Sequence, residues 1–164
     1  MLEFHRKASP WLNLLGRLVL GGVLLLAGYL KAKAPAEAAM SVRAYEVLPI
    51  SLANTLGYIL PWLEIGAGLL LIIGVAVKKS AIFGGALMVL FIIAIGQAWA
   101  RGLSIDCGCF GSGGAVAPGH TKYLQEILRD LGLALIAVYL FLFPQGKLSL
   151  DTFNLNRATT DNQE

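Results

Sequence analysis

The sequence predicts an all-α protein, an integral membrane four-helix bundle with a short amphipathic helix between spans one and two. Of the 164 residues, 57% are hydrophobic and only 14% are charged, which is too apolar for an ordinary soluble domain. Four stretches approach or exceed the roughly 20 residues that cross a hydrocarbon core. They leave little chain for a second domain, so we expect a single transmembrane domain over residues 1–144 and a polar tail over 145–164.

Span one is expected over about residues 11–30. Trp11 and Tyr29 stand near its two ends, where amphipathic rings favour the membrane interface. Lys31 and Lys33 follow directly, and basic side chains at this position typically anchor a helix at the membrane edge. We therefore expect both lysines to mark the exit of this span.

The segment 34–50 carries charged residues among alanines and is bracketed by two prolines. This pattern predicts a short amphipathic helix that lies on the membrane. Span two follows over about residues 52–77, and Lys78 and Lys79 close it.

Span three is expected over about residues 81–100 and span four over about 123–143, where Pro144 stops it. The loop between them, about 103–121, is rich in glycine and contains a proline. This composition predicts a loop without regular structure.

Spans one and two each carry small residues at helical spacing, which lets helices approach closely in lipid. The two stripes include Gly21 and Gly28 in span one, and Gly57, Pro61 and Gly68 in span two.

The two cysteines of the chain stand one residue apart in this loop, in Asp106-Cys107-Gly108-Cys109. Two residues of extended backbone reach roughly 7 Å, so the sulfurs can bond only if the chain bends between them. Gly108, without a Cβ, permits that bend. Such a small disulfide ring stabilises the fold by only about 1.6 kcal/mol before strain is counted. Because strained, exposed disulfides are easily reduced, the pair is predicted to be a redox couple.

Two other interpretations of the pair stay open. Cys107, Cys109 and His120 could bind a metal ion, with Asp106 as a further ligand, although structural zinc sites usually use four Cys or His ligands. The pair could also be inert, but its polar and glycine-rich surroundings do not suit a packed thiol.

Ionisable residues inside the predicted spans are candidates for a supporting role. Glu64 lies near the middle of span two, where a carboxylic side chain usually faces the bundle interior and has a partner. Arg17 and Asn13 in span one are the expected partners. An Arg17–Glu64 bridge would pin two helices together, and the alternative is a role in proton movement or in a quinone-like pocket.

Further charged residues flank the cysteine loop. Gln97 and Arg101 share a face at the end of span three, from which they could orient the loop. Arg129 and Asp130 enter span four one turn after Glu126. We expect these charges to anchor the helix end rather than to act in catalysis, with Asp130 able to face the interior.

The charge distribution excludes a nucleic-acid-binding role and leaves the orientation open. The net charge is +3, but the basic residues stand singly or in pairs beside apolar spans, as membrane-edge anchors do. Lys and Arg outside the spans divide equally between the two sides. A cytoplasmic thiol pool would keep a labile disulfide reduced, so the redox interpretation favours an external cysteine loop.

With these residues laid out, the chain resembles the MauE and DoxX group of small bacterial four-span membrane proteins over roughly residues 17–143. The resemblance rests on the glycine-rich first span, Tyr45 with Pro49, Pro61-Trp62-Leu63-Glu64, Asp106-Cys107-Gly108-Cys109-Phe110-Gly111, and Arg129-Asp130. It implies the bacterial cytoplasmic membrane, a link to methylamine utilisation, Cys107 and Cys109 as the redox pair, a thioredoxin-like partner, and a quinone as a cofactor of DoxX-like relatives.

The leading hypothesis is a multi-pass membrane thiol-disulfide redox protein. Its cysteine pair would exchange electrons with an external thioredoxin-like or other disulfide-bearing protein, with coupling to quinone as an option. From other classes, the alternatives are a non-catalytic membrane scaffold for a redox complex and a thiolate metal-binding or transport protein.

Overall fold

The computed structural model describes residues 2–108, 113–117 and 121–144, and it confirms the helical fold class. One short helix separates the first two long ones, as predicted, and a small hairpin precedes the last. The elements are α1 Leu2–Lys33, α2 Pro35–Ala44, α3 Ile50–Ile73, α4 Val77–Ala100, β1 Ile105–Cys107, β2 Gly113–Ala115 and α5 Tyr123–Leu142.

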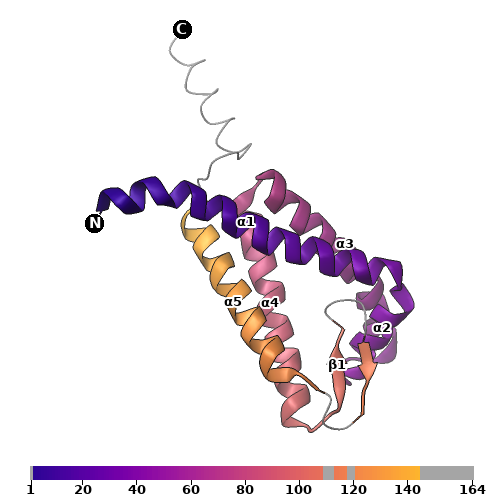
Figure 1. Ribbon diagram of the computed structural model, residues 1–164. Helices are drawn as coiled ribbons and strands as arrows, with labels where there is room; N and C mark the ends of the chain where they lie inside the picture. The colour runs from indigo at the N-terminus through magenta and orange to yellow at the C-terminus, as the bar shows by residue number, and fades with distance from the viewer. Residues whose placement is uncertain (1, 109–112, 118–120, 145–164) are drawn as a thin grey trace.

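The long helices pack in two pairs, α1 against α3 and α4 against α5 (Figure 1). The start of α1 meets the end of α5, where the Asn13 side-chain amide donates a hydrogen bond to the Phe143 carbonyl. The hairpin and α2 lie at the opposite end of the molecule (Figure 1). The apolar core between the pairs centres on fully buried leucines, among them Leu20, Leu71 and Leu140.

Three helices in the described part of the chain are long and apolar enough to cross a membrane: Pro10–Lys33 within α1, Ile50–Ile73 and Val77–Ala100. The predicted fourth span, α5, does not reach the same apolar content because Glu126, Arg129 and Asp130 fall in its first turns. These helices indicate that the protein is a multi-pass membrane protein. The fourth crossing and the single domain stay predictions, and the predicted tail lies outside the described residues.

The boundary between spans two and three differs from the prediction. Helix α3 ends at Ile73 because Gly74 adopts a left-handed conformation, φ 80°, which caps the helix. Helix α4 then begins at Val77, so Lys78 and Lys79 open α4 instead of closing the preceding span. The Lys78 ammonium lies 4.8 Å from the centre of the Phe141 ring on α5.

The predicted small-residue faces bring α1 and α3 into backbone contact. A Cβ on Gly21 would lie 2.9 Å from the Gly68 carbonyl oxygen, and a Cβ on Gly68 would lie 2.7 Å from that of Gly21. Gly28 makes a similar close contact: a Cβ at this position would lie 2.6 Å from the Pro61 carbonyl oxygen. A side chain larger than that of glycine therefore does not fit at Gly21, Gly28 or Gly68.

The prediction of an irregular cysteine loop is wrong in part. Residues 105–107 pair antiparallel with 113–115, and Ile105 is buried against Ile95 and Tyr123. The glycines permit this hairpin because Gly108 and Gly114 adopt positive φ angles of 66° and 127°. Glycine therefore shapes the loop instead of denying it structure.

The contact between α2 and α3 generates a stability prediction. A Cβ on Gly57 would lie 2.4 Å from Ala39 Cα, so Gly57→Ala should lower the free energy of unfolding by roughly 1–3 kcal/mol. Gly66→Ala, in the same helix but with nothing within 4 Å of its Cβ, is the matched control and should be neutral or stabilising. Thermal unfolding in detergent micelles compares the two, and equal stability of both variants would contradict this packing.

Candidate functional site

A buried ion pair lies between α1 and α3. The Lys31 ammonium on α1 lies 2.5 Å from Glu64 Oε1 on α3, and both side chains are almost wholly shielded from solvent. The same ammonium lies 5.1 Å from the centre of the Phe91 ring on α4. Lys31 therefore points into the protein, and its predicted role as a membrane-edge anchor is wrong.

The predicted Arg17–Glu64 bridge is also wrong. Arg17 is fully buried, but its guanidinium donates to the Leu71 and Ile72 carbonyls at 2.8 and 2.9 Å, near the end of α3. Glu64 stands about two turns further from that end, where Lys31 reaches it. The predicted helix pin between spans one and two exists, with Lys31 in place of Arg17.

Asp130 faces the interior of the bundle, where it is 1% exposed. Its Oδ1 lies 2.8 Å from the Arg129 guanidinium, whose side chain is partly exposed. The sequence could not decide between an end anchor and an interior position for this carboxylate. In the structure Arg129 occupies the rim and Asp130 the interior.

Cys107 ends strand β1 and is half-buried. The Tyr45 hydroxyl donates to the Cys107 carbonyl at 3.1 Å, which ties the strand to the end of α2. Gln97 and Arg101 each donate to the Tyr45 carbonyl at 3.1 Å. Gln97 and Arg101 thus contact the residue that binds the Cys107 backbone, and their role in orienting the loop stays a prediction.

Arg101 makes a second contact at the same place, an exposed ion pair with Glu46 at 2.9 Å. Asp106 acts on the other side of Cys107, where its Oδ1 accepts a hydrogen bond from the Gly108 N–H at 3.2 Å. This short-range bond stabilises the bend after the strand. Cys109 and His120 lie outside the described residues.

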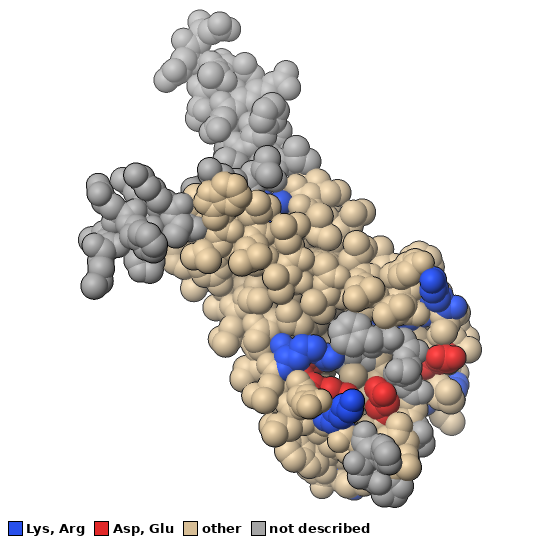
Figure 2. Space-filling model, viewed as in Figure 1, with Lys and Arg blue, Asp and Glu red and all other residues tan. Residues whose placement is uncertain are grey.

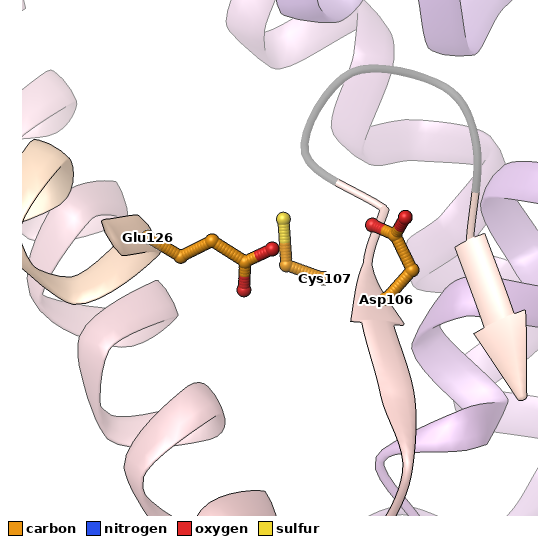
Figure 3. A group of neighbouring side chains, drawn as sticks. All are labelled: Asp106, Cys107 and Glu126. Atoms are coloured by element: carbon orange, nitrogen blue, oxygen red, sulfur yellow. The ribbon is translucent and has the colours of Figure 1, made fainter. Parts of the chain in front are cut away.

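Glu126 reaches from the first turns of α5 toward the Cys107 sulfur (Figure 3). The side-chain ligand atoms of Asp106, Cys107 and Glu126 all lie within 4.8 Å of one another. Glu126 stands nineteen positions after Cys107 in the sequence, so no local spacing could have revealed this contact. The structure adds Glu126 to the candidate site.

The surroundings of Glu126 raise the pKa of its carboxyl group. Burial is the largest influence and raises the pKa of the carboxyl. A hydrogen bond from the Cys107 thiol and the Arg129 guanidinium act in the opposite direction, while the Asp106 and Asp130 carboxylates reinforce the rise. A carboxylate with a raised pKa is a stronger base than an ordinary one, which suits it to exchange a proton with a neighbouring thiol.

The donor set near Cys107 bears on the metal alternative. It offers one thiol and two carboxylates, a mixture of soft and hard ligands that differs from the Cys and His sets of structural zinc sites. The predicted ligand set of Cys107, Cys109 and His120 has one member among the described residues. Metal binding stays an alternative.

Two small cavities lie next to the cysteine and the buried ion pair. One has a volume of about 40 Å³ and is lined by residues that include Tyr45, Cys107, Lys31 and Phe91. The other, of about 10 Å³, is lined by Lys31, Phe91, Glu64 and Asp130 among apolar neighbours. Lys31 and Phe91 belong to both walls, so they separate the two spaces.

Charged side chains gather at one end of the visible surface, over the hairpin and the start of α5, while most of the remaining described face is uncharged (Figure 2). This distribution suits a protein with a lipid-facing body and one polar end. Together, the apolar helices, the charged interior and the cysteine at the polar end define a small helical membrane protein with a candidate thiol site.

The chain belongs to the MauE family. The family model described as "Methylamine utilisation protein MauE" matches residues 9–143. This result confirms the MauE part of the resemblance seen in the sequence, and the DoxX part stays a prediction.

Two relatives carry the name "Methylamine utilization protein MauE". The protein from Methylorubrum extorquens is 39% identical over 99 residues, which cover 58% of this chain and 50% of the relative. The protein from Methylophilus methylotrophus is 29% identical over 153 residues, which cover 93% of this chain and 77% of the relative. The chain thus matches half the length of the first relative. No solved structure matches this chain.

The buried ion pair predicts a strong dependence of stability on Lys31. Lys31→Met should lower the free energy of unfolding by about 3–5 kcal/mol, because it leaves the Glu64 carboxylate buried without its partner. The double variant Lys31→Met/Glu64→Met should recover much of this loss, since it removes both charges. Thermal unfolding measures both variants.

A matched control for the ion pair is Glu46→Gln, which breaks an ion pair whose side chains are 43% and 61% exposed. It should change stability by less than about 1 kcal/mol. A Lys31→Met/Glu64→Met variant that is less stable than Lys31→Met alone would contradict the explanation that an unpaired buried charge causes the loss.

The contact between Glu126 and Cys107 predicts a change in thiol reactivity. In a Cys109→Ser background, Glu126→Gln should shift half-maximal alkylation of Cys107 by iodoacetamide to lower pH by roughly one unit. The direction follows because the substitution removes a negative charge that disfavours the thiolate. Glu37→Gln, on the exposed face of α2, is the control. An unchanged or upward-shifted profile for Glu126→Gln would exclude electrostatic contact between the two groups.

Proposed function

We propose that this protein is a membrane thiol-disulfide redox protein. Cys107 and Cys109 exchange electrons with a thioredoxin-like or other disulfide-bearing protein at the polar end of the molecule. The observation that carries the proposal is the half-buried Cys107 with the Glu126 carboxyl beside its sulfur. A structural thiol needs no such neighbour, whereas thiol exchange needs a group that takes up a proton.

The exchange proceeds in two sulfur displacements. The first cysteine thiol loses its proton and its sulfur attacks one sulfur of the partner's disulfide. That S–S bond breaks, a mixed disulfide forms, and the released partner sulfur takes up a proton. The second cysteine then attacks the mixed disulfide and frees the partner's other sulfur as a thiol. Two electrons and two protons pass to the partner, and Cys107 and Cys109 become a disulfide.

Glu126 supports the part of this sequence that involves Cys107. Its carboxylate accepts the proton when the sulfur becomes a thiolate, and it returns the proton when the thiol forms again. Tyr45 holds the backbone of Cys107 through the bond to its carbonyl, so the sulfur keeps its position beside Glu126. Five further polar side chains support the fold around the site: Glu64, Arg17, Asp106, Arg101 and Asp130.

The setting of the reaction is part of the same proposal. The protein resides in the bacterial cytoplasmic membrane, with the hairpin on the external side, where no thiol pool keeps the disulfide reduced. Because each sulfur displacement is reversible, a partner dithiol can instead reduce the Cys107–Cys109 disulfide, and in that direction a membrane quinone accepts the two electrons and two protons when the disulfide forms again. The names of the two relatives support a role in methylamine utilisation.

Trapping of a mixed disulfide tests the proposal. Of the variants Cys107→Ser and Cys109→Ser, the one that keeps the attacking sulfur should accumulate a covalent complex with a disulfide-bearing protein in membranes, because no second thiol resolves it. Reductant should release the partner. The double variant Cys107→Ser/Cys109→Ser is the control and should form no complex.

Two results would contradict the proposal. One is a double variant that retains full function in cells, which would favour the scaffold. The other is a purified protein that shows no dithiol-disulfide interconversion at any potential between strong thiol reductants and strong disulfide oxidants. A membrane-impermeant maleimide applied to intact cells tests the external placement, since it should label the remaining cysteine of each single variant.

A further inference from the structure

A groove at the polar end of the molecule takes no part in the thiol exchange. It has a volume of about 330 Å³ and lies between the end of α4 and the start of α5. This volume falls in the range of roughly 300–1,000 Å³ that is typical of small-molecule sites. We call it the α4–α5 groove and define it by its described lining residues, which are Trp99, Thr121, Lys122, Tyr123, Leu124 and Gln125.

The aromatic wall of the groove is held in place from behind. The Trp99 and Tyr123 rings stack with their centres 6.1 Å apart. Tyr123 is 6% exposed and its hydroxyl donates a hydrogen bond to the Leu103 carbonyl. The Ile105 N–H donates to the same hydroxyl at 3.4 Å. These contacts fix the Tyr123 ring, so the groove keeps its shape without a ligand.

The groove lies at the edge of a membrane span. Helix α4 is long and apolar enough to cross a membrane, and Trp99 stands one residue before its end. The Trp99 side chain is 52% exposed. Tryptophan favours the boundary between hydrocarbon and headgroups. Phospholipid headgroups are therefore the molecules that surround the groove at this level.

An exposed apolar face of α5 starts at the groove. Six large apolar side chains recur along it at spacings of three and four residues, and each is between 48% and 64% exposed: Leu124, Leu128, Leu131, Leu135, Val138 and Leu142. This spacing places them on one side of the helix. Because α5 packs along α4, the face lies at the depth of the bilayer (Figure 1). An acyl chain that begins in the groove can follow this face.

The polar part of the groove favours a negatively charged headgroup. Of the described residues that line the groove, Lys122 alone is charged, and its side chain is exposed. Thr121 and Gln125 add a hydroxyl and an amide that can donate hydrogen bonds to phosphate oxygens. An anionic headgroup neutralises Lys122, whereas the headgroup of phosphatidylcholine adds a positive charge of its own.

The two parts of the groove together match an amphiphile with an anionic head. We propose that the α4–α5 groove binds an anionic phospholipid. Its phosphate contacts Lys122, and one acyl chain lies against Trp99 and the apolar face of α5.

Trp99 itself reports on the occupant of the groove. The chain contains three tryptophans, so Trp11→Phe/Trp62→Phe leaves Trp99 as the single fluorophore. The full chain with these two substitutions is reconstituted into mixed bilayers of phosphatidylcholine and phosphatidylglycerol, with bromine on the acyl chains of one lipid or the other. Bromine quenches tryptophan fluorescence on contact, so the quenching curves give the relative affinity of the two lipids for the groove. This ratio should favour phosphatidylglycerol about fivefold, the attraction expected from one lysine.

Substitutions of Lys122 test the headgroup contact. Lys122→Gln should bring the affinity ratio close to one, and Lys122→Glu should favour phosphatidylcholine. Lys79→Gln is the matched control because Lys79 is also an exposed lysine beside a membrane span, at the opposite end of α4. It should leave the ratio at Trp99 unchanged.

A second reporter separates binding in the groove from general enrichment of anionic lipid around a basic protein. Trp11→Phe/Trp99→Phe leaves Trp62, which lies on α3 and is 67% exposed. The affinity ratio measured at Trp62 should be close to one.

Four results would overturn the proposal. These are equal affinity of the two lipids at Trp99, the same preference at Trp99 and Trp62, an unchanged ratio in Lys122→Gln, and absence of quenching at Trp99 by either lipid. The last result would show that water, a second copy of the chain or another protein covers the groove. If the Lys122 variants fail to fold, the comparison of Trp99 with Trp62 still decides, because both reporters keep Lys122.

Discussion

The ion pair between Lys31 and Glu64 is the interaction on which the rest of the structure depends. In an apolar interior neither charge is tolerable alone, so the pair fixes how α1 and α3 lie along one another. The close glycine contacts between the two helices allow this arrangement, because they bring the backbones near enough for the side chains to meet. The pair also places Lys31 against Phe91 of α4 and between the two internal cavities.

The candidate thiol site is assembled from elements that are distant in sequence. Strand β1 supplies Cys107, the residue after α2 is Tyr45, and α5 contributes Glu126. Gln97 near the end of α4 and Arg101 just after it hold Tyr45 in turn. A short hairpin alone would be marginal in water, so its position depends on these contacts with the helices. This dependence connects the geometry of the cysteine to the packing of the whole bundle.

The sequence predicted the helices well because length and apolar content determine them directly, and it predicted the α1–α3 contact because small residues recur at helical spacing. It misplaced Lys31, since a lysine after an apolar run usually lies at the membrane surface, whereas here α1 continues past it to Lys33. The sequence assigned Glu126 to anchoring the helix end, because only tertiary packing brings it to Cys107. The hairpin was missed because its strands have three residues each, too few for a periodic pattern.

The exposed Arg101–Glu46 pair and the buried Lys31–Glu64 pair respond differently to ionic strength. Dissolved ions reach this pair and weaken it, whereas the enclosed Lys31–Glu64 pair is shielded from them. Rising salt therefore loosens the attachment between α4 and the end of α2 while the bundle interior keeps its arrangement. Gln97 still donates to the Tyr45 carbonyl, so part of this attachment does not depend on salt.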